Sequence, residues 1–267
     1  DMLCLALFAL IGLVGFVLEQ RRAVEPIMPL HLFRHRTFVL AGLIGFIVGV
    51  SLFGAVTFLP LYMQVVKNAT PTSAGLQMLP LMGGLLVVSA ITGRLISRWG
   101  RYRVFPIIGT LLQVIALGLL SRLQLDTPMA LMNLYMGLLG AGLGMVMQVL
   151  ILAVQNSVEL RHMGVATSGA TLFRSIGGAI GVSLFGALFS HSLLGGLGSD
   201  FAASAGGAAS LSPAAVHALP TALQHSYLQA FSGAMHGVFL LAGVITSVAF
   251  ALSWLLREVP LRKATQA

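Results

Sequence analysis

The sequence predicts an all-α integral membrane protein with about seven transmembrane helices, and three observations support this fold class. Of the 267 residues, 57% are hydrophobic and 8% are charged, with a mean hydropathy of +0.96. An ordinary soluble domain carries about 25% charged residues, so too few polar side chains remain here to cover a water-exposed surface. The apolar residues gather in blocks of roughly 18 to 27, the length that crosses about 30 Å of hydrocarbon as a helix. The basic residues fall mainly in alternate loops between these blocks.

Seven apolar blocks follow one another along the chain, and each is expected to be one membrane-spanning helix. They cover residues 2–18, 38–63, 74–96, 103–121, 128–154, 165–190 and 231–256. The chain opens with Asp1 inside an apolar run, which indicates a fragment of a longer protein. The first block lacks a basic leader, so we do not expect it to be a cleavable signal peptide.

The basic residues predict how these helices are oriented. Twelve of the 15 lysine and arginine residues fall on one side of the membrane, Lys67 and Arg122 fall on the other, and Arg174 lies inside a block. Because basic loops stay on the cytoplasmic side, we expect a multi-pass protein of the cytoplasmic membrane whose tail, 257–267, is cytoplasmic. The net charge of +8 needs no nucleic-acid partner, because these bases form no separate basic domain.

Two segments are expected to lie outside the spans. The loop 19–37 contains an amphipathic stretch, 26–36, which is expected to form an interfacial helix on the cytoplasmic surface. The loop 191–230, on the outer side, begins rich in glycine, alanine and serine and is expected to become helical at Ser212-Pro213. Its apolar stripe is expected to rest on the outer membrane surface, with a kink or interruption at Pro220, and consists of Val216, Leu219, Leu223 and Tyr227.

The sequence contains no signature of an enzyme. The single cysteine, Cys4, excludes internal disulfides and supports no metal cluster. We find no pairing of a nucleophile with a base, no glycine-rich phosphate loop after a strand and no metal-ligand spacing.

Glycines recur four residues apart inside several blocks. Such pairs present a face of small residues that allows close helix packing. They are Gly45 and Gly49, Gly140 and Gly144, and Gly177 and Gly181. Static packing is the favoured interpretation of any single pair, but their spread over several helices also suits helices that slide or bend.

The loop after the third block carries a family resemblance. Residues 93–103 resemble the signature loop of the major facilitator superfamily, G-x-L-x-D-[RK]-x-G-[RK]-[RK]. The positions that match are Gly93, Leu95, Arg98, Gly100 and Arg101. Ser97 replaces the acidic residue and Tyr102 the last basic one, as is typical of the second copy of this loop, in the C-terminal half. The missing carboxylate weakens any ion-pair gate between two halves.

Two further segments, 25–38 and 164–181, resemble the fourteen-helix drug:proton antiporter branch of that superfamily. This resemblance implies that 2–18 is a linker helix and that 38–256 is the six-helix C-terminal bundle, built from two three-helix units of inverted topology, 38–121 and 128–256. It also implies a missing N-terminal half, alternating access, a proton gradient as the energy source without a bound cofactor, and a hydrophobic or cationic small-molecule substrate.

Several polar residues inside the blocks are candidates for a cavity or a gate. They are Arg174, Gln148, Gln155, Asn156, Tyr135 and His236. Arg174 lies about 15 Å along the helix axis from Gly164, so it either faces a cavity or snorkels toward the cytoplasm. Gln148 and Gln155, seven residues apart, either line one cavity or bond neighbouring helices. For Tyr135, packing is the alternative role, and for His236 a position at a helix end near water.

The apolar blocks contain no aspartate or glutamate. Proton-coupled antiport needs a titratable group, which the resemblance places mostly in the N-terminal half. The chain alone is therefore expected not to couple protons to transport. Two other hypotheses remain open, namely a transporter of a specific metabolite and a truncated membrane protein that does not transport.

Overall fold

The computed structural model describes residues 35–159, 162–204, 212–217 and 219–256, together with Gly15 and Glu258. The expected linker helix at 2–18, the interfacial helix at 26–36 and the tail at 257–267 lie outside these residues, apart from Gly15, His35, Arg36 and Glu258. Side chains are not described for residues 198–204 and 222.

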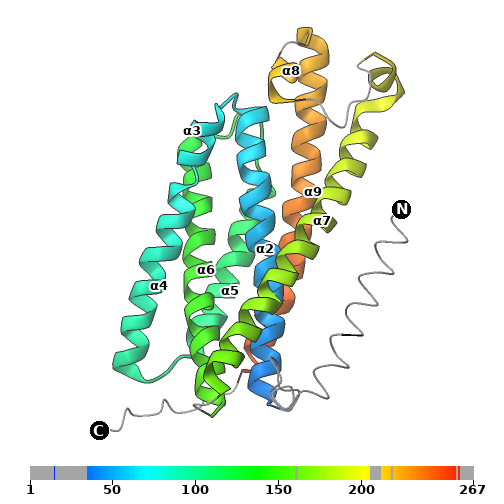
Figure 1. Cartoon of the computed structure of the whole chain (residues 1–267). Coiled ribbons are helices and arrows are strands. Elements are labelled where there is room, and N and C mark those ends of the chain that lie inside the picture. The colour runs from blue at the N-terminus through cyan, green and yellow to red at the C-terminus, as the bar shows by residue number, and fades with distance from the viewer. Residues whose placement is uncertain are drawn as a thin grey trace.

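The described residues form a helical bundle, so the predicted all-α fold class is confirmed (Figure 1). Its elements are α2 (Arg36–Val66), α3 (Pro71–Leu76), α4 (Leu79–Trp99), α5 (Val104–Leu120), α6 (Met129–Ser157), α7 (Met163–Ser204), α8 (Pro213–His217) and α9 (Thr221–Ser253). Five stretches, in α2, α3–α4, α6, α7 and α9, are long and apolar enough to cross a membrane. The sixth, α5, has 17 residues, and at 1.5 Å per residue it is about 26 Å long.

The third block, expected at 74–96, is divided into α3 and α4. Thr70 caps α3, because its Oγ1 accepts a hydrogen bond from the backbone N–H of Ser73 at 3.2 Å, and Pro71 occupies the first helical position. The chain then turns at Gln77 and Met78 before α4 begins. The two pieces together form one apolar stretch that ends at Trp99.

The loop expected at 191–230 is shorter than predicted, because helices enter it from both sides. α7 continues to Ser204, and α9 begins at Thr221. Pro220 has a φ of −54° and forms the N-cap of α9, so it interrupts the helical segment, and the stripe residues Leu223 and Tyr227 belong to α9. Ser212 caps α8, as the Ser-Pro pair predicts, because its Oγ accepts from the N–H of Ala215 at 3.3 Å.

Two helices occupy the centre of the bundle. In their most apolar windows, 61% of α2 and 56% of α6 are buried, against 17% for the α3–α4 stretch and 22% for α7. α4 lies at one edge of the bundle and α7 and α9 lie toward the other, while α3 and α8 lie at the same end (Figure 1). α6 packs against α4 and α5, α2 packs against α7 and α9, and α5 also packs against α9. α4 and α7 therefore keep much of their apolar surface uncovered.

Candidate functional site

Helices α4 and α6 approach so closely that their backbones are in contact, and we call this line of contact the α4–α6 seam. A Cβ atom added to Gly140 would overlap the carbonyl oxygen of Leu81, and one added to Gly144 would overlap that of Leu85. From the other side, a Cβ on Gly84 would lie 2.5 Å from the carbonyl oxygen of Gly137. The sequence predicted Gly140 and Gly144 as packing positions, and the structure places both against α4.

The α2–α7 seam has the same character. A Cβ added to Gly177 would overlap the carbonyl oxygen of Phe46, and one added to Gly49 would overlap that of Arg174. At Gly181 an added Cβ would lie 2.8 Å from the Cα atom of Val50. Gly177 and Gly181 thus bring α7 against α2.

The two seams correspond position by position. Gly140 and Gly137 on α6 each stand 91 residues after their counterparts Gly49 and Phe46 on α2, and Arg174 and Gly177 on α7 each stand 93 residues after Leu81 and Gly84 on α4. In each seam, the glycine of each helix lies three residues from the carbonyl of the same helix that the partner's glycine meets. Such a repeated pattern is what two related three-helix units would produce.

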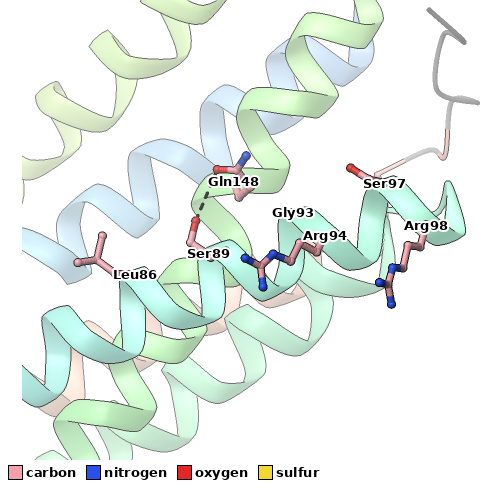
Figure 2. A pocket seen from close by; sticks show the side chains of 8 residues that line it. Leu86, Ser89, Gly93, Arg94, Ser97, Arg98 and Gln148 are labelled. Carbon is pink, nitrogen blue, oxygen red and sulfur yellow. Dashed lines mark hydrogen bonds between the residues drawn. The ribbon is translucent and has the colours of Figure 1, made fainter.

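A groove opens along α4 beside α6, and four residues of the signature loop line it, including the matching positions Gly93 and Arg98 (Figure 2). Its volume is about 680 Å³. It is lined by Leu86, Ser89, Ala90, Gly93, Arg94, Ser97, Arg98 and, from α6, Gln148. Ser89 Oγ lies 3.5 Å from Gln148 Oε1, at the outer limit of a hydrogen bond. Gln148 therefore faces α4, and its side chain is exposed in the groove.

The turn between α4 and α5 is built from the rest of the signature loop. Gly100 adopts a left-handed φ of 68°, and its N–H donates to the carbonyl of Ile96 at 2.9 Å, which closes the C-terminus of α4. Leu95 packs against a small buried cluster around Ile96, and Arg101 is exposed on the turn. Arg103 Nη2 donates to the carbonyl of Trp254 at 2.7 Å and so ties the turn to the end of α9.

Arg174 borders a much smaller cavity between α2, α6 and α7. The cavity measures about 20 Å³, close to the space needed for one water molecule. Besides Arg174 and Thr171, its walls are apolar side chains and Gly45, with Met147, Leu150 and Ile151 contributed by α6. Arg174 is half-buried, and among the described residues its guanidinium has no hydrogen-bond or ion-pair partner.

The other cavity candidates lie apart from one another. Gln155 Nε2 donates to Thr167 Oγ1 at 3.1 Å, so Gln155 joins α6 to α7 while Gln148 faces α4. Asn156 is half-buried at the end of α6, and Tyr135 is half-buried against the main apolar core. His236 Nδ1 lies 2.6 Å from the carbonyl oxygen of Ser121, near the end of the bundle that carries α3 and α8.

His236 belongs to a set of contacts that the sequence analysis missed. Two side chains of α2 and two of α9 hold the segment between α5 and α6 by its backbone carbonyls. Tyr62 Oη donates to Gln124 O at 2.9 Å, Lys67 Nζ to Leu125 O at 2.6 Å and Thr127 O at 2.9 Å, and Ser232 Oγ to Leu123 O at 3.2 Å, while His236 Nδ1 pairs with Ser121 O. The only signal in the sequence was a lone lysine in an otherwise base-poor loop.

Comparisons with known proteins match most of the chain. A family model described as the Major Facilitator Superfamily matches residues 2–182. An uncharacterized MFS-type transporter of Mycobacterium tuberculosis is 42% identical over 254 residues, which are 95% of this chain and 37% of that protein. The multidrug transporter protein MdtP of Bacillus subtilis is 40% identical over 67% of this chain and 33% of its own length.

The coverage differs among the relatives. This chain spans 37% of the length of the mycobacterial relative but 82% of the tetracycline resistance determinant of Streptomyces rimosus, to which it is 32% identical. Among solved structures, a bacterial homolog of the human lysosomal transporter Spinster, in an inward-facing and unoccupied conformation, matches with a TM-score of 0.61 and 17% identity. That match covers 86% of this chain and 51% of the solved one, and it establishes the fold.

Proposed function

Because the chain belongs to the Major Facilitator Superfamily, a family of membrane transporters rather than enzymes, we propose that it forms the C-terminal half of a proton-coupled multidrug efflux antiporter. Two kinds of relative support the efflux assignment, the multidrug transporter of Bacillus subtilis and the tetracycline resistance determinant of Streptomyces rimosus. The chain spans 37% of the mycobacterial relative and so corresponds to one part of a longer transporter.

The observation that carries the proposal is the polar groove on α4. The groove is lined by polar side chains, which are those of Ser89, Arg94 and Gln148. They belong to helices that are long and apolar enough to span a membrane. In lipid, polar and charged side chains are costly, and they face a water-filled cavity or a protein partner. A second helical half on this side of the bundle would convert the groove into part of the wall of a central cavity.

The mechanism follows from the rigid seams. Backbone contact through Gly140 and Gly177 fixes α4 to α6 and α7 to α2, so the bundle would move as one body against its counterpart. Alternating access then consists of rocking about a site near the midplane. The basic loops support an orientation in which the turn between α4 and α5 is cytoplasmic and the end that carries α3 and α8 is outside. In that orientation the groove would face cytoplasmic substrate.

Transport by the complete gene product that contains this chain tests the proposal. We expect cells that lack their own efflux pumps to accumulate less of a fluorescent lipophilic dye when they express it, and to lose this difference when a protonophore collapses the gradient. Gln148→Leu, which removes the amide from the groove, should reduce efflux several-fold, whereas Ile108→Leu, on the exposed face of α5, should not. Equal dye accumulation with and without the protein would exclude multidrug efflux.

A further inference from the structure

The groove along α4 has a chemical character of its own, cationic at one end and apolar at the other. We propose that it binds an amphiphilic anion, whose oxyanion group lies on Arg94 and Arg98 and whose apolar chain runs along α4 toward Leu86. The groove would bind this class of ligand whether or not the ligand is transported.

The cationic end of the groove consists of the guanidinium groups of two arginines of α4. Arg94 and Arg98 stand four residues apart on α4, so they lie on one face of the helix, and both side chains are exposed. Among the residues that the structure describes, neither has a hydrogen bond or an ion pair. A carboxylate, phosphate or sulfonate could accept from both guanidinium groups at once, in the geometry that arginine favours for such anions.

The direction of Arg94 argues against snorkelling as the whole explanation. An arginine that snorkels extends toward the nearest water, which here lies at the end of α4, beyond Trp99. Figure 2 shows the guanidinium of Arg94 extending the other way, back along α4 toward Ser89. This direction follows from the tilt of helical side chains toward the N-terminus, and it places the positive charge inside the groove.

The remaining wall fits an apolar chain. Leu86 is 66% exposed, Ala90 is also exposed, and Gly93 leaves the floor of the groove free of a side chain. From Leu86 to Arg98 the helix axis extends about 18 Å, which accommodates a medium-length alkyl chain. The volume of about 680 Å³ lies within the usual range of ligand sites.

Two sources share this chemistry. One is an anionic lipid, whose phosphate would lie on the arginines and whose acyl chain would follow α4. The other is a small amphiphilic acid that enters from the aqueous side. Both differ from a cationic substrate, one of the two classes that the family resemblance implies, because two positive charges repel a cation at this end of the groove.

Binding to the purified chain in a neutral detergent tests the inference without a proton gradient. Trp99 directly follows Arg98, and the variant Trp254→Phe leaves Trp99 as the sole tryptophan reporter. We expect saturable changes in its fluorescence with phosphatidylglycerol and with dodecanoate. Phosphatidylcholine tests the need for net negative charge, and inorganic phosphate tests the need for an apolar chain, so neither should saturate in the same range.

Matched variants connect the signal to the groove. Arg94→Gln and Arg98→Gln should each weaken anion binding at least about tenfold, since each removes a charge-assisted hydrogen bond. Arg122→Gln removes the same charge from an exposed position at the other end of α5 and should leave binding unchanged. An unchanged thermal unfolding midpoint in each variant separates lost binding from lost folding.

The outcomes distinguish the sources and can refute the proposal. Saturation by phosphatidylglycerol alone assigns the groove to a lipid, and saturation by dodecanoate as well assigns it to amphiphilic acids in general. The proposal fails if phosphatidylcholine or inorganic phosphate binds as tightly, or if the arginine variants bind like the unaltered chain. It also fails if no anion binds, in which case the arginines face another protein segment. None of these results depends on efflux, so the proposed function is tested separately.

Discussion

At the scale of single residues, the glycines inside the helices differ in what lies opposite their missing side chains. Gly140 faces a backbone carbonyl of α4 so closely that a methyl group has no room. At Gly83, on α4, no described atom lies within 4 Å of the position that a Cβ atom would take. The same residue type therefore serves close packing at one position and has no packing contact with the described residues at the other.

This difference predicts opposite effects of one substitution. Gly140→Ala should destabilise the bundle by about 1–3 kcal/mol, because α6 must move away from α4 to admit the methyl group. Gly83→Ala should be neutral or stabilise by up to about 1 kcal/mol, since alanine favours a helix more than glycine does. Thermal unfolding of the two variants in one detergent makes the comparison, and equal midpoints would contradict the packing role of Gly140.

Gly100 illustrates a second reason for a glycine. Nothing lies within 4 Å of a Cβ added there, but its φ of 68° is unfavourable for a side chain. We expect Gly100→Ala to cost about 1 kcal/mol and Gly100→Asn to cost less, because asparagine tolerates the left-handed region. The unfolding midpoints of both variants test this, and an alanine variant as stable as glycine would show that the turn relaxes.

At the scale of elements, the segment between α5 and α6 shows how side chains can organise a loop. Five of its backbone carbonyls accept hydrogen bonds from Tyr62, Lys67, Ser232 or His236. Tyr62 lies in the last turns of α2 and Lys67 caps that helix, whereas Ser232 and His236 lie within α9. The segment that connects α5 to α6 is therefore also bound to α2 and α9. Lys67 makes two of the contacts, to the carbonyls of Leu125 and Thr127.

Removing Lys67 should loosen this segment. Lys67→Met eliminates both contacts, and each hydrogen bond to a charged group contributes about 1.5–3 kcal/mol. We expect trypsin to cut the folded variant faster after Arg122, which is exposed in the same segment. Lys67→Arg, which keeps the charge and the donors, should restore much of the protection, and unchanged cleavage in Lys67→Met would show that the loop is held by other contacts.

The ends of the helices were predicted well where charged residues flank an apolar block. They were predicted less well where small residues extend the helix beyond that block. α5 was expected at 103–121 and extends over Val104–Leu120, because arginines stand at both ends of a uniformly apolar block. α7 continues past the expected end at 190 into a stretch rich in glycine, serine and alanine, whose weak hydropathy resembles that of a loop. The start of α9 was missed because its apolar stripe also fits a helix on the membrane surface.

For the candidate site, the sequence predicted which residues share one face of a helix, but not which neighbouring helix each of them contacts. The spacing of seven between Gln148 and Gln155 places them on one side of α6, yet one faces α4 and the other bonds α7. Because α6 is central, a single face of it meets different helices at different heights. The contacts of Lys67 could not be predicted, because backbone carbonyls leave no signal in a sequence.

At the scale of the whole molecule, charge is distributed very unevenly. Among the described residues, Asp126, Glu159 and Glu258 lie outside the helices, and Asp200 lies beyond the apolar stretch that ends at Leu197. Arg174 lies inside the bundle without a described partner. The part of the chain that the structure describes therefore offers guanidinium groups but no carboxylate within the membrane.

This imbalance predicts that the chain alone does not exchange protons for substrate. Liposomes that contain it, loaded with a pH-sensitive dye, should show no proton flux when a transported drug is added, because arginine stays protonated at all relevant pH values. Liposomes with the complete gene product should show such a flux, and empty liposomes provide the baseline. Drug-dependent proton flux through the chain alone would contradict the expectation that the coupling carboxylate lies elsewhere.

The α4–α6 and α2–α7 seams differ in when they can form during synthesis of the chain. The α4–α6 seam joins two helices that are separated in the chain by α5 alone, whereas Gly49 of α2 meets α7 only after far more of the polypeptide has been made. At about 5–20 residues per second, the roughly 130 residues that separate Gly49 from Gly177 take on the order of 10 s to synthesise. During that interval α2 is in the membrane with its glycine face unpaired, while α4 and α6 can already associate. Two seams of the same design are thus completed in a fixed temporal order, and α2 is the helix most exposed to premature association.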